Sequence, residues 1–297
     1  MAEQTDAQTL MAPQARATAS NLVLRRITVR TFIYVLLAII LLIQLFPLLW
    51  SLLTSLMTSQ ETTTVPATLF PAKPTLDSYV QAIQGDLGSY YRNSIIASTV
   101  STVITMILST LAAYAFARLR FRFKTPLLLS VLLLSLFPPL AQVIPLYEIL
   151  QKLHIVGTIG ALILPYSVFG LPLAVLVLIA FFQDVPTTLE EAAIVDGMNR
   201  LGAFLRIILP ITLPGIFTAT IIVFVGDWNE YLFALNFTNS GAYTLPVGIV
   251  NISQTEFTTN FGILSAAMIL SIVPLVALTL LLERRIVSGL TAGALKG

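Results

Sequence analysis

The chain has 297 residues, of which 57% are hydrophobic and only 10% are charged, and its formal net charge is +2. This composition excludes an ordinary water-soluble domain, because the apolar residues gather in blocks of about 20, the length that a bilayer core requires of a helix. The chain has no cysteine and a single histidine, which excludes disulfides and thiolate chemistry and argues against a metal site, while the small net charge argues against a nucleic-acid partner.

Six apolar blocks follow one another along the chain, and each predicts a transmembrane helix. A polar segment at 1–24, rich in Gln, Thr and Ala, is expected to be a loose cytoplasmic tail. Three arginines then introduce an apolar run that is too long for a signal-peptide core, so we expect an uncleaved first span. These blocks predict an all-α membrane domain at 25–285 and a cytoplasmic tail at 286–297. The six spans are predicted at about 32–53, 94–116, 126–149, 158–182, 211–235 and 262–282.

The lysines and arginines indicate how these spans are oriented, because cytoplasmic flanks carry an excess of positive charge. With six spans, about 13 of the 16 lysines and arginines fall on the side of both termini, including four in the run 118–124. We therefore expect both termini in the cytoplasm. The loop at 183–210, between the fourth and fifth spans, then lies in the cytoplasm as well.

The loop at 183–210 has the pattern of two short helices joined by a tight turn. Thr187-x-x-Glu190 and Thr188-x-x-Glu191 each fit a capping box, and Gly197 stands where a left-handed residue would end the first helix. A helix of about nine residues is too short to be stable alone in water, so it needs a partner surface. Its apolar residues would pack there or on the membrane helices, leaving Glu190, Glu191 and Asp196 to meet cations. The same pattern also fits an ordinary solvated cytoplasmic loop.

Three separated motifs resemble those of one family. The stretch Glu191-Ala192-Ala193, followed by Gly197 and by Ile207-Ile208-Leu209-Pro210 at the family's spacing, is similar to the EAA loop of ATP-binding-cassette (ABC) importer permeases. The segments 227–231 and 289–297 agree with the carbohydrate-uptake branch of that family, the permeases of the maltose-transporter type. The resemblance covers about residues 25–297 and departs at Met198, where an alanine is usual.

The resemblance implies a six-span permease in the plasma (inner) membrane of a prokaryote, whose cytoplasmic loop is a coupling helix that docks in a cleft of an ATPase subunit. Glu191 would pair with a basic residue of that subunit. The implied partners are a second permease subunit, usually a different chain, two copies of the ATPase, an extracytoplasmic solute-binding protein and a sugar or sugar-like solute. The coupling residues implied by the resemblance are Glu190, Glu191, Ala192, Ala193, Asp196 and Gly197.

ATP chemistry is expected in a separate subunit. The chain contains no Gly-rich Gly-Lys-Ser/Thr phosphate loop, so it cannot cradle ATP itself. ATP and Mg would be bound by the partner ATPases. We therefore expect a transport subunit that is not an enzyme, with no catalytic residue and no cofactor of its own.

Polar residues inside two apolar blocks are candidates for the path of a sugar. Charges within an apolar span usually face a cavity or a partner, and two carboxylates flank Trp228 and Asn229 in the fifth block. An indole can stack on a sugar ring while an amide and a carboxylate pair with its hydroxyls, which suits Trp228, Asn229 and Glu230. Gln142 follows two prolines that would break or kink the third helix and expose backbone carbonyls. An equally good interpretation makes 227–230 the wet outer end of a helix, with Trp228 in the aromatic belt.

Two other classes of protein remain open at this point. In an ion-coupled secondary transporter or channel, Asp227 and Glu230 would bind a proton or a sodium ion, but such carriers favour internal repeats and no clear repeat is visible here. A membrane anchor or assembly subunit without a transport path would leave Asn229 and Glu230 without a purpose. We prefer the permease because it accounts for the loop at 183–210.

Overall fold

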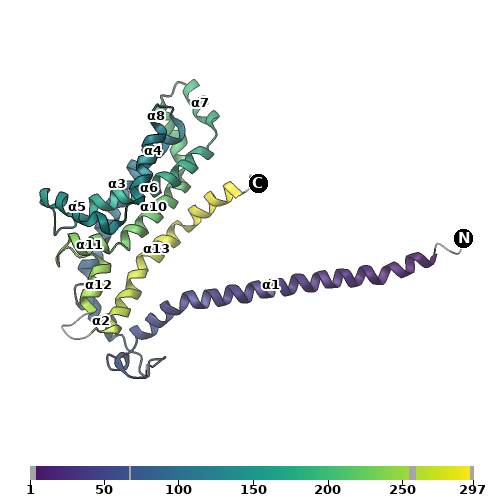
Figure 1. Cartoon of the computed structure of the whole chain (residues 1–297), viewed down its shortest axis with the longest axis horizontal. Coiled ribbons are helices and arrows are strands. Elements are labelled where there is room, and N and C mark those ends of the chain that lie inside the picture. Colours follow the sequence, from purple (N-terminus) through teal and green to yellow (C-terminus); the bar gives the residue numbers. More distant parts are fainter. Residues whose placement is uncertain (1–4, 67, 254–258, 295–297) are drawn as a thin grey trace. The chain divides into compact units, whose positions relative to one another are not determined.

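A computed structural model describes the backbone of residues 5–66, 68–253 and 259–294, and the side chains within 29–281 apart from the same gaps. These residues form helices and the segments that join them, with an isolated β-bridge between Gly157 and Thr238. The all-α fold class is therefore confirmed for the described residues. The chain divides into two compact units, residues 1–53 and residues 54–297 (Figure 1).

The first unit consists of most of helix α1 (Thr5–Ser55). Its part from Val29 to Ser55 is long and apolar enough to cross a membrane, as the first predicted span requires. Helix α1 begins at Thr5, within the segment 1–24 that was expected to be a loose tail, and the cytoplasmic position of that segment stays a prediction. Alanine, glutamine and leucine favour helices, and a helix that is already nucleated by the apolar span extends into them at little cost.

Three long helices form the centre of the second unit: α3 (Leu87–Arg118), α6 (Gly160–Asp184) and α10 (Leu213–Trp228). The buried face of α3 is made of small hydroxyl residues at helical spacing, which let the other helices approach closely. Helices α6 and α10 also meet closely, since a Cβ at Gly215 would lie 2.2 Å from the ring of Phe181. The small polar residues buried on α3 are Ser94, Ser98, Ser101, Thr102, Thr105, Ser109 and Thr110.

The third apolar block, expected as one span at 126–149, is two helices. Helix α4 (Lys124–Leu133) continues into the short helix η2 (Leu134–Leu136), and helix α5 (Pro139–Lys152) leaves at an angle of 102°. Pro138 and Pro139 stand at the break, where they cannot continue the hydrogen-bond ladder of α4. This geometry fits a broken span or a re-entrant loop.

The fifth block, expected as one span at 211–235, is also broken. Helix α10 ends at Trp228, and a separate short helix, α11 (Leu232–Phe237), follows and packs against α5 and α6. On its other side, α10 is bent by 74° from a preceding helical stretch. That stretch comprises α8 (Arg200–Ala203), the π-helical segment η3 (Phe204–Ile208) and α9 (Leu209–Ile211). Counting each bent pair as one span gives up to six candidate spans in the described residues.

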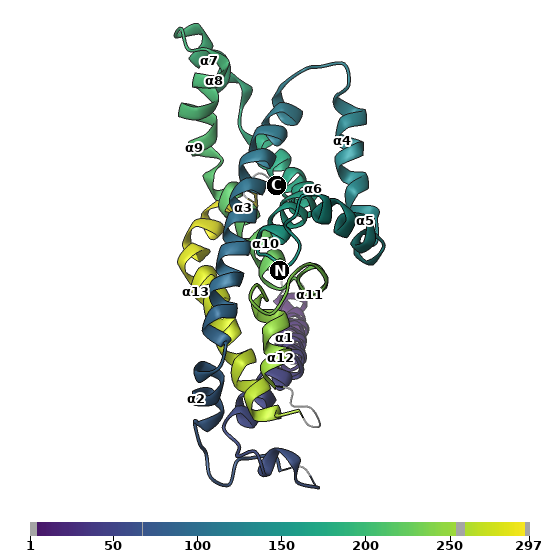
Figure 2. The same cartoon turned by 90° about the vertical axis from the view of Figure 1, so that its left-hand side faces the viewer.

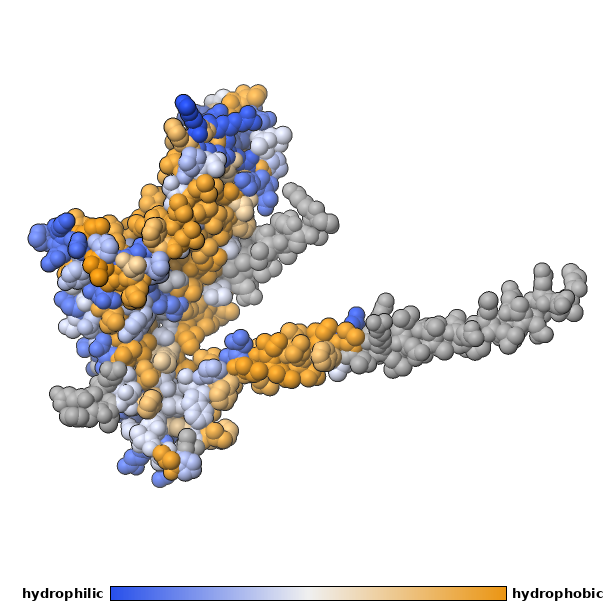
Figure 3. Space-filling model, in the orientation of Figure 1, coloured by the Kyte–Doolittle hydropathy of each residue, from blue (hydrophilic) through white to orange (hydrophobic). Residues whose placement is uncertain are grey.

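The remaining elements lie around the central helices. Helix α13 (Phe261–Ala294) packs against α10, α12 (Leu245–Ser253) and α2 (Asp77–Gln84), and η1 (Glu61–Thr63) follows α1. Helix α7 (Thr187–Val195) and α8 lie at one end of the second unit, while α2 and α12 lie toward the other end in both views (Figure 2). The space-filling view shows apolar side chains along the helices and hydrophilic ones gathered at the α7–α8 end (Figure 3).

Candidate functional site

Helix α7 ends in the turn that the sequence predicts. Gly197 has a φ of +91°, a left-handed conformation that favours glycine. The amide of Met198 donates to the carbonyl of Ala193 at 3.0 Å and that of Gly197 donates to the carbonyl of Ile194 at 3.0 Å, the bonding pattern of a Schellman cap. The chain therefore reverses at Gly197. Asn199 starts α8 by accepting the amide of Gly202 on Oδ1 at 2.7 Å.

The two capping boxes expected at the start of α7 are wrong. Pro186 occupies the N-cap position, and no side chain there caps the helix. The carboxylate of Glu190 is directed elsewhere, since its Oε1 accepts a hydrogen bond from the hydroxyl of Tyr114 at 2.7 Å. A tertiary partner has replaced the local one.

The predicted coupling residues divide into an inner and an outer set. Ala193 is buried and Glu190 is half-buried, so both face the helical bundle. The outer face carries both charge and apolar surface, and Val195 is 86% exposed. An exposed apolar patch beside a charge is typical of a surface that meets another protein. The exposed members of the predicted set are Glu191, Ala192, Asp196 and Gly197.

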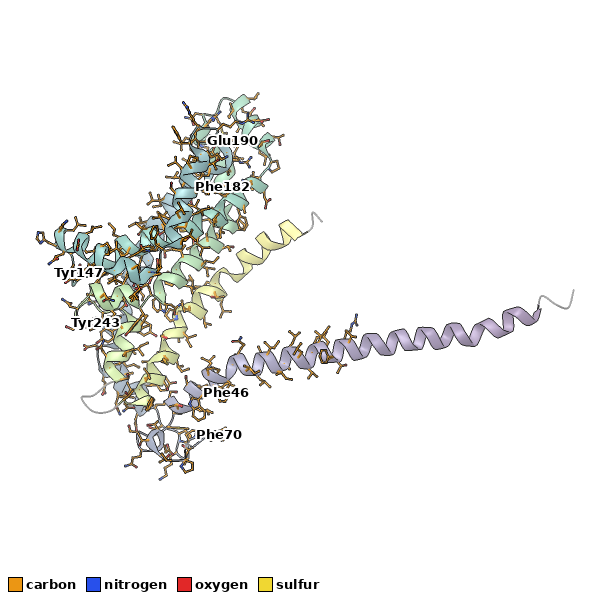
Figure 4. The ribbon with its side chains drawn as sticks, viewed as in Figure 1. Phe46, Phe70, Tyr147, Phe182, Glu190 and Tyr243 are labelled. Carbon is orange, nitrogen blue, oxygen red and sulfur yellow. The ribbon has the colours of Figure 1, made fainter. Side chains whose placement is uncertain are left out.

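The inner face of α7 rests on an aromatic cluster. Tyr114 of α3 lies between Phe182 of α6 and Phe204 of η3, with ring centroids 6.0 Å and 4.4 Å away. All three rings are buried in one core cluster with Leu178 and Ile208. Figure 4 shows Glu190 and Phe182 at this end of the unit. The sequence interpretation missed Tyr114, because no local pattern links it to a residue 76 positions away.

The second candidate region lies where α10 ends. Asp227 is 9% exposed, and its Oδ2 accepts a hydrogen bond from Oγ1 of Thr102 on α3 at 3.2 Å. Trp228 is buried, stacked on Phe224 at 5.8 Å and near Tyr91 at 6.1 Å. Its indole therefore serves as packing between α3 and α10 in this structure.

Glu230 organises the break between α10 and α11. Its Oε2 accepts hydrogen bonds from the hydroxyl of Tyr166 at 2.8 Å and from the amide of Ala234 at 3.1 Å, and its Oε1 accepts the amide of Phe233 at 2.7 Å. The carboxylate thus satisfies first-turn amides of α11, which have no partner within the helix. Both of its oxygens are engaged within the chain.

Two of the four predicted path residues line one cavity. A half-open cavity of about 230 Å³ is lined by Trp228 and Asn229 together with residues of α12 and α13, but not by Gln142 or Glu230. Gln142 donates from Nε2 to the carbonyl of Phe137 at 3.0 Å, across the proline break. Asn229 is exposed and donates from Nδ2 to the carbonyl of Val225 at 2.8 Å. Within the described residues, no group of three His, Cys, Asp or Glu side chains could hold a metal ion.

Apolar helices of membrane length and an exposed helical loop at one end are features of an integral membrane protein. The chain belongs to the family described as the binding-protein-dependent transport system inner membrane component, whose model matches residues 105–291. It is therefore an inner-membrane component of a transport system.

Curated relatives span most of the chain. It is 43% identical over 239 residues to the sulfoquinovosyl glycerol transport system permease protein SmoH of Agrobacterium fabrum, covering 80% of this chain and 84% of that one. The trehalose transport system permease protein SugB of Mycobacterium tuberculosis is 41% identical over 239 residues, covering 80% of this chain and 87% of that one. The trehalose/maltose transport system permease protein MalG of Thermococcus litoralis is 38% identical over 80% and 87%.

A solved structure shares the fold. A chain of a bacterial ABC transporter involved in the import of the acidic polysaccharide alginate matches with a TM-score of 0.71 at 20% identity, covering 84% of this chain and 94% of that one. The helical arrangement described above is therefore that of an ABC importer chain.

Proposed function

We propose that this chain is a membrane-spanning subunit of an ATP-driven importer that carries a sugar or sugar-like solute across the inner membrane. The family supports a binding-protein-dependent transport system, and the relatives at 38–43% identity are named for glycoside or disaccharide transport. In this proposal an extracytoplasmic binding protein delivers the solute, and a second permease subunit, usually a different chain, completes the path.

The observation that carries the coupling part of the proposal is the outer face of α7. A nine-residue helix ending in a left-handed turn presents Glu191 and Val195 to its surroundings at one end of the unit. Such a helix gains its stability from what it packs against, and its outer face is without a partner within the described part of this chain. An ATPase cleft with a basic residue would match both the carboxylate and the apolar patch.

In the proposed mechanism, the ATPase subunits drive the movement and the permease subunits form the path of the solute. Two ATPase subunits bind ATP and Mg and close on one another, moving the α7 helices docked in them. This chain contributes the helices that convert that movement into opening on one or the other side of the membrane. Its basic run at 118–124 lies at the α7 end, since a guanidinium nitrogen of Arg118 donates to the carbonyl of Val185. This positive charge supports the proposal that the α7 end faces the cytoplasm.

Charge reversal at Glu191 tests this proposal. In mild-detergent extracts, the wild-type chain should copurify an ATPase whose hydrolysis is stimulated by the binding protein loaded with solute. Glu191→Arg should lose the ATPase or its stimulation, because it sets a cation against the basic residue of the cleft. Glu148→Arg, at an exposed glutamate of α5, is the matched control and should keep both. Absence of any ATPase from the wild-type preparation, with uptake driven by an ion gradient, would contradict the proposal.

An ion-coupled carrier is the weaker candidate. It requires carboxylates that are free to exchange a proton or a sodium ion, whereas the oxygens of Glu230 accept three hydrogen bonds from within the chain. Two of those donors are first-turn amides of α11, which would lose their acceptor if the Glu230 carboxylate turned away.

A further inference from the structure

We propose that Glu190 does not meet the ATPase but acts as a positioning residue, which joins with Tyr114 to tether α7 to α3. The tether would pass the movement of the docked helix into the centre of the bundle. The tether itself follows from the geometry of this chain, while its role in transport rests on the proposed function above.

The hydrogen bond between the two side chains is short, and its donor, Tyr114, is fixed by the packing of neighbouring rings. The 2.7 Å contact joins a phenol hydroxyl to a carboxylate oxygen, a charge-assisted pair that is stronger than a bond between neutral groups. Tyr114 is only 9% exposed and is fixed between the rings of Phe182 and Phe204. The position of its hydroxyl is therefore restricted, and that hydroxyl donates to the carboxylate of Glu190.

A second contact lies one helical turn further along α3. Arg118 donates to the carbonyl of Val185, a buried residue in the link between α6 and α7. Residues four apart lie on the same face of a helix. One face of α3 therefore makes both contacts: Tyr114 binds α7 itself, and Arg118 binds the link that leads into α7. A displacement of α7 must either break both contacts or move α3.

Helix α3 leads from this tether to the other polar region of the bundle. It runs for 32 residues and packs along α6 and α10. Thr102 lies twelve residues before Tyr114, about 18 Å deeper along the axis, and hydrogen-bonds to Asp227 at the end of α10. The tether therefore connects the exposed loop to the segment that carries Trp228 and Asn229 through a single continuous helix.

Neighbouring glutamates thus take opposite roles. Successive residues of an α-helix point about 100° apart, which turns Glu190 toward Tyr114 and leaves Glu191 exposed. The exposed carboxylate of Glu191 is available for a partner, while the carboxylate of Glu190 holds α7 against α3 when that partner moves.

Tyr114→Phe is the sharpest test, because it removes one oxygen atom and leaves the aromatic packing. Amide hydrogen exchange over 187–195 in the purified full-length chain should become about tenfold faster, as expected when a charge-assisted hydrogen bond is lost. In the complex with its ATPase, subunits should still copurify, but the ratio of solute-stimulated to unstimulated hydrolysis should fall several-fold. Tyr147→Phe, at an exposed tyrosine on α5 away from Glu190 (Figure 4), should change neither.

Variants of the acceptor separate the tether from a plain charge effect. Glu190→Gln keeps an oxygen that the hydroxyl of Tyr114 can reach and should retain most of the slow exchange, whereas Glu190→Ala should match Tyr114→Phe. Adding Tyr114→Phe to Glu190→Ala should have little further effect, because the two residues act as one pair. Equal effects of Glu190→Gln and Glu190→Ala, or full additivity of Glu190→Ala with Tyr114→Phe, would overturn the proposal.

The two readouts decide the tether independently of the proposed function. Unchanged exchange in Tyr114→Phe would refute the tether even if the ATPase copurifies. Faster exchange with an unchanged stimulation ratio would refute its role in transmission. If the wild-type chain binds no ATPase, the proposed function fails, and the exchange measurement alone still confirms or refutes the link between α3 and α7.

Discussion

The α7–α8 loop and the junction of α10 with α11 both contain carboxylates that lie close together in the sequence, but the two regions differ in how many of these carboxylates are hydrogen-bonded within the chain. In the loop, one glutamate is bound to the bundle and its neighbour is exposed. At the junction, Asp227 and Glu230 both accept hydrogen bonds from other helices or from the backbone. A carboxylate in an apolar chain can thus hold the fold together or be kept for a partner, and only its tertiary neighbours show which.

The largest expected effect is at Glu230. Glu230→Ala would leave the hydroxyl of Tyr166 and two amides of α11 without their acceptor, and we expect a loss of about 3 kcal/mol in stability. Loss of the monodisperse protein on heating in detergent measures it, with Glu148→Ala as the exposed control. A thermal midpoint equal to that of the control would show that the junction does not depend on this carboxylate.

A smaller effect is expected on the other side of the same region. Thr102→Val keeps the shape of the side chain but removes the donor to Asp227, which should cost about 1.5 kcal/mol. A double-mutant cycle with Asp227→Ala, which removes the acceptor, isolates the pair, since the two changes should not add. Full additivity of the thermal shifts would place the two residues in separate environments.

The smallest effect on stability is expected in the loop. Glu191→Ala removes an exposed carboxylate, so the free energy of unfolding of the isolated chain should change by no more than about 0.5 kcal/mol. The thermal midpoint should therefore stay close to that of the wild type. The same measurement used for Glu230→Ala makes this a direct comparison of one substitution in two regions. A large shift would mean that Glu191 supports the fold, and the division between inner and outer glutamates would be wrong.

Local features of the loop could be predicted from the sequence. The left-handed Gly197 at the end of α7 follows from a short-range rule and is confirmed, and α7 has the expected nine residues although the capping boxes expected at its start are absent. The break in the third apolar block follows from Pro138 and Pro139, although the 102° angle does not. Apolar blocks also locate the long helices, because membrane thickness fixes their length.

Long-range partners could not be predicted in this way. Glu190 was expected to cap its own helix, but Tyr114, 76 residues away, takes its carboxylate. The fifth span was expected to be continuous through Glu230, but the helix breaks there, and Tyr166, 64 residues away, and the start of α11 engage its carboxylate. Both failures have one cause, which is that a short motif cannot tell whether a side chain finds its partner nearby or across the bundle.

The π-helical segment η3 affects the direction in which the α7–α8 loop points. A π turn holds one residue more than an α turn, and each residue of an α-helix advances the chain by about 100° around the axis. Deleting one residue from Phe204–Ile208 would leave a sequence able to run as plain α-helix, yet would rotate everything on one side of it by about 100° against the other. Helix α7 could stay folded while Glu191 faced a different direction, so the extra residue of this π turn determines the direction in which the outer face of α7 points.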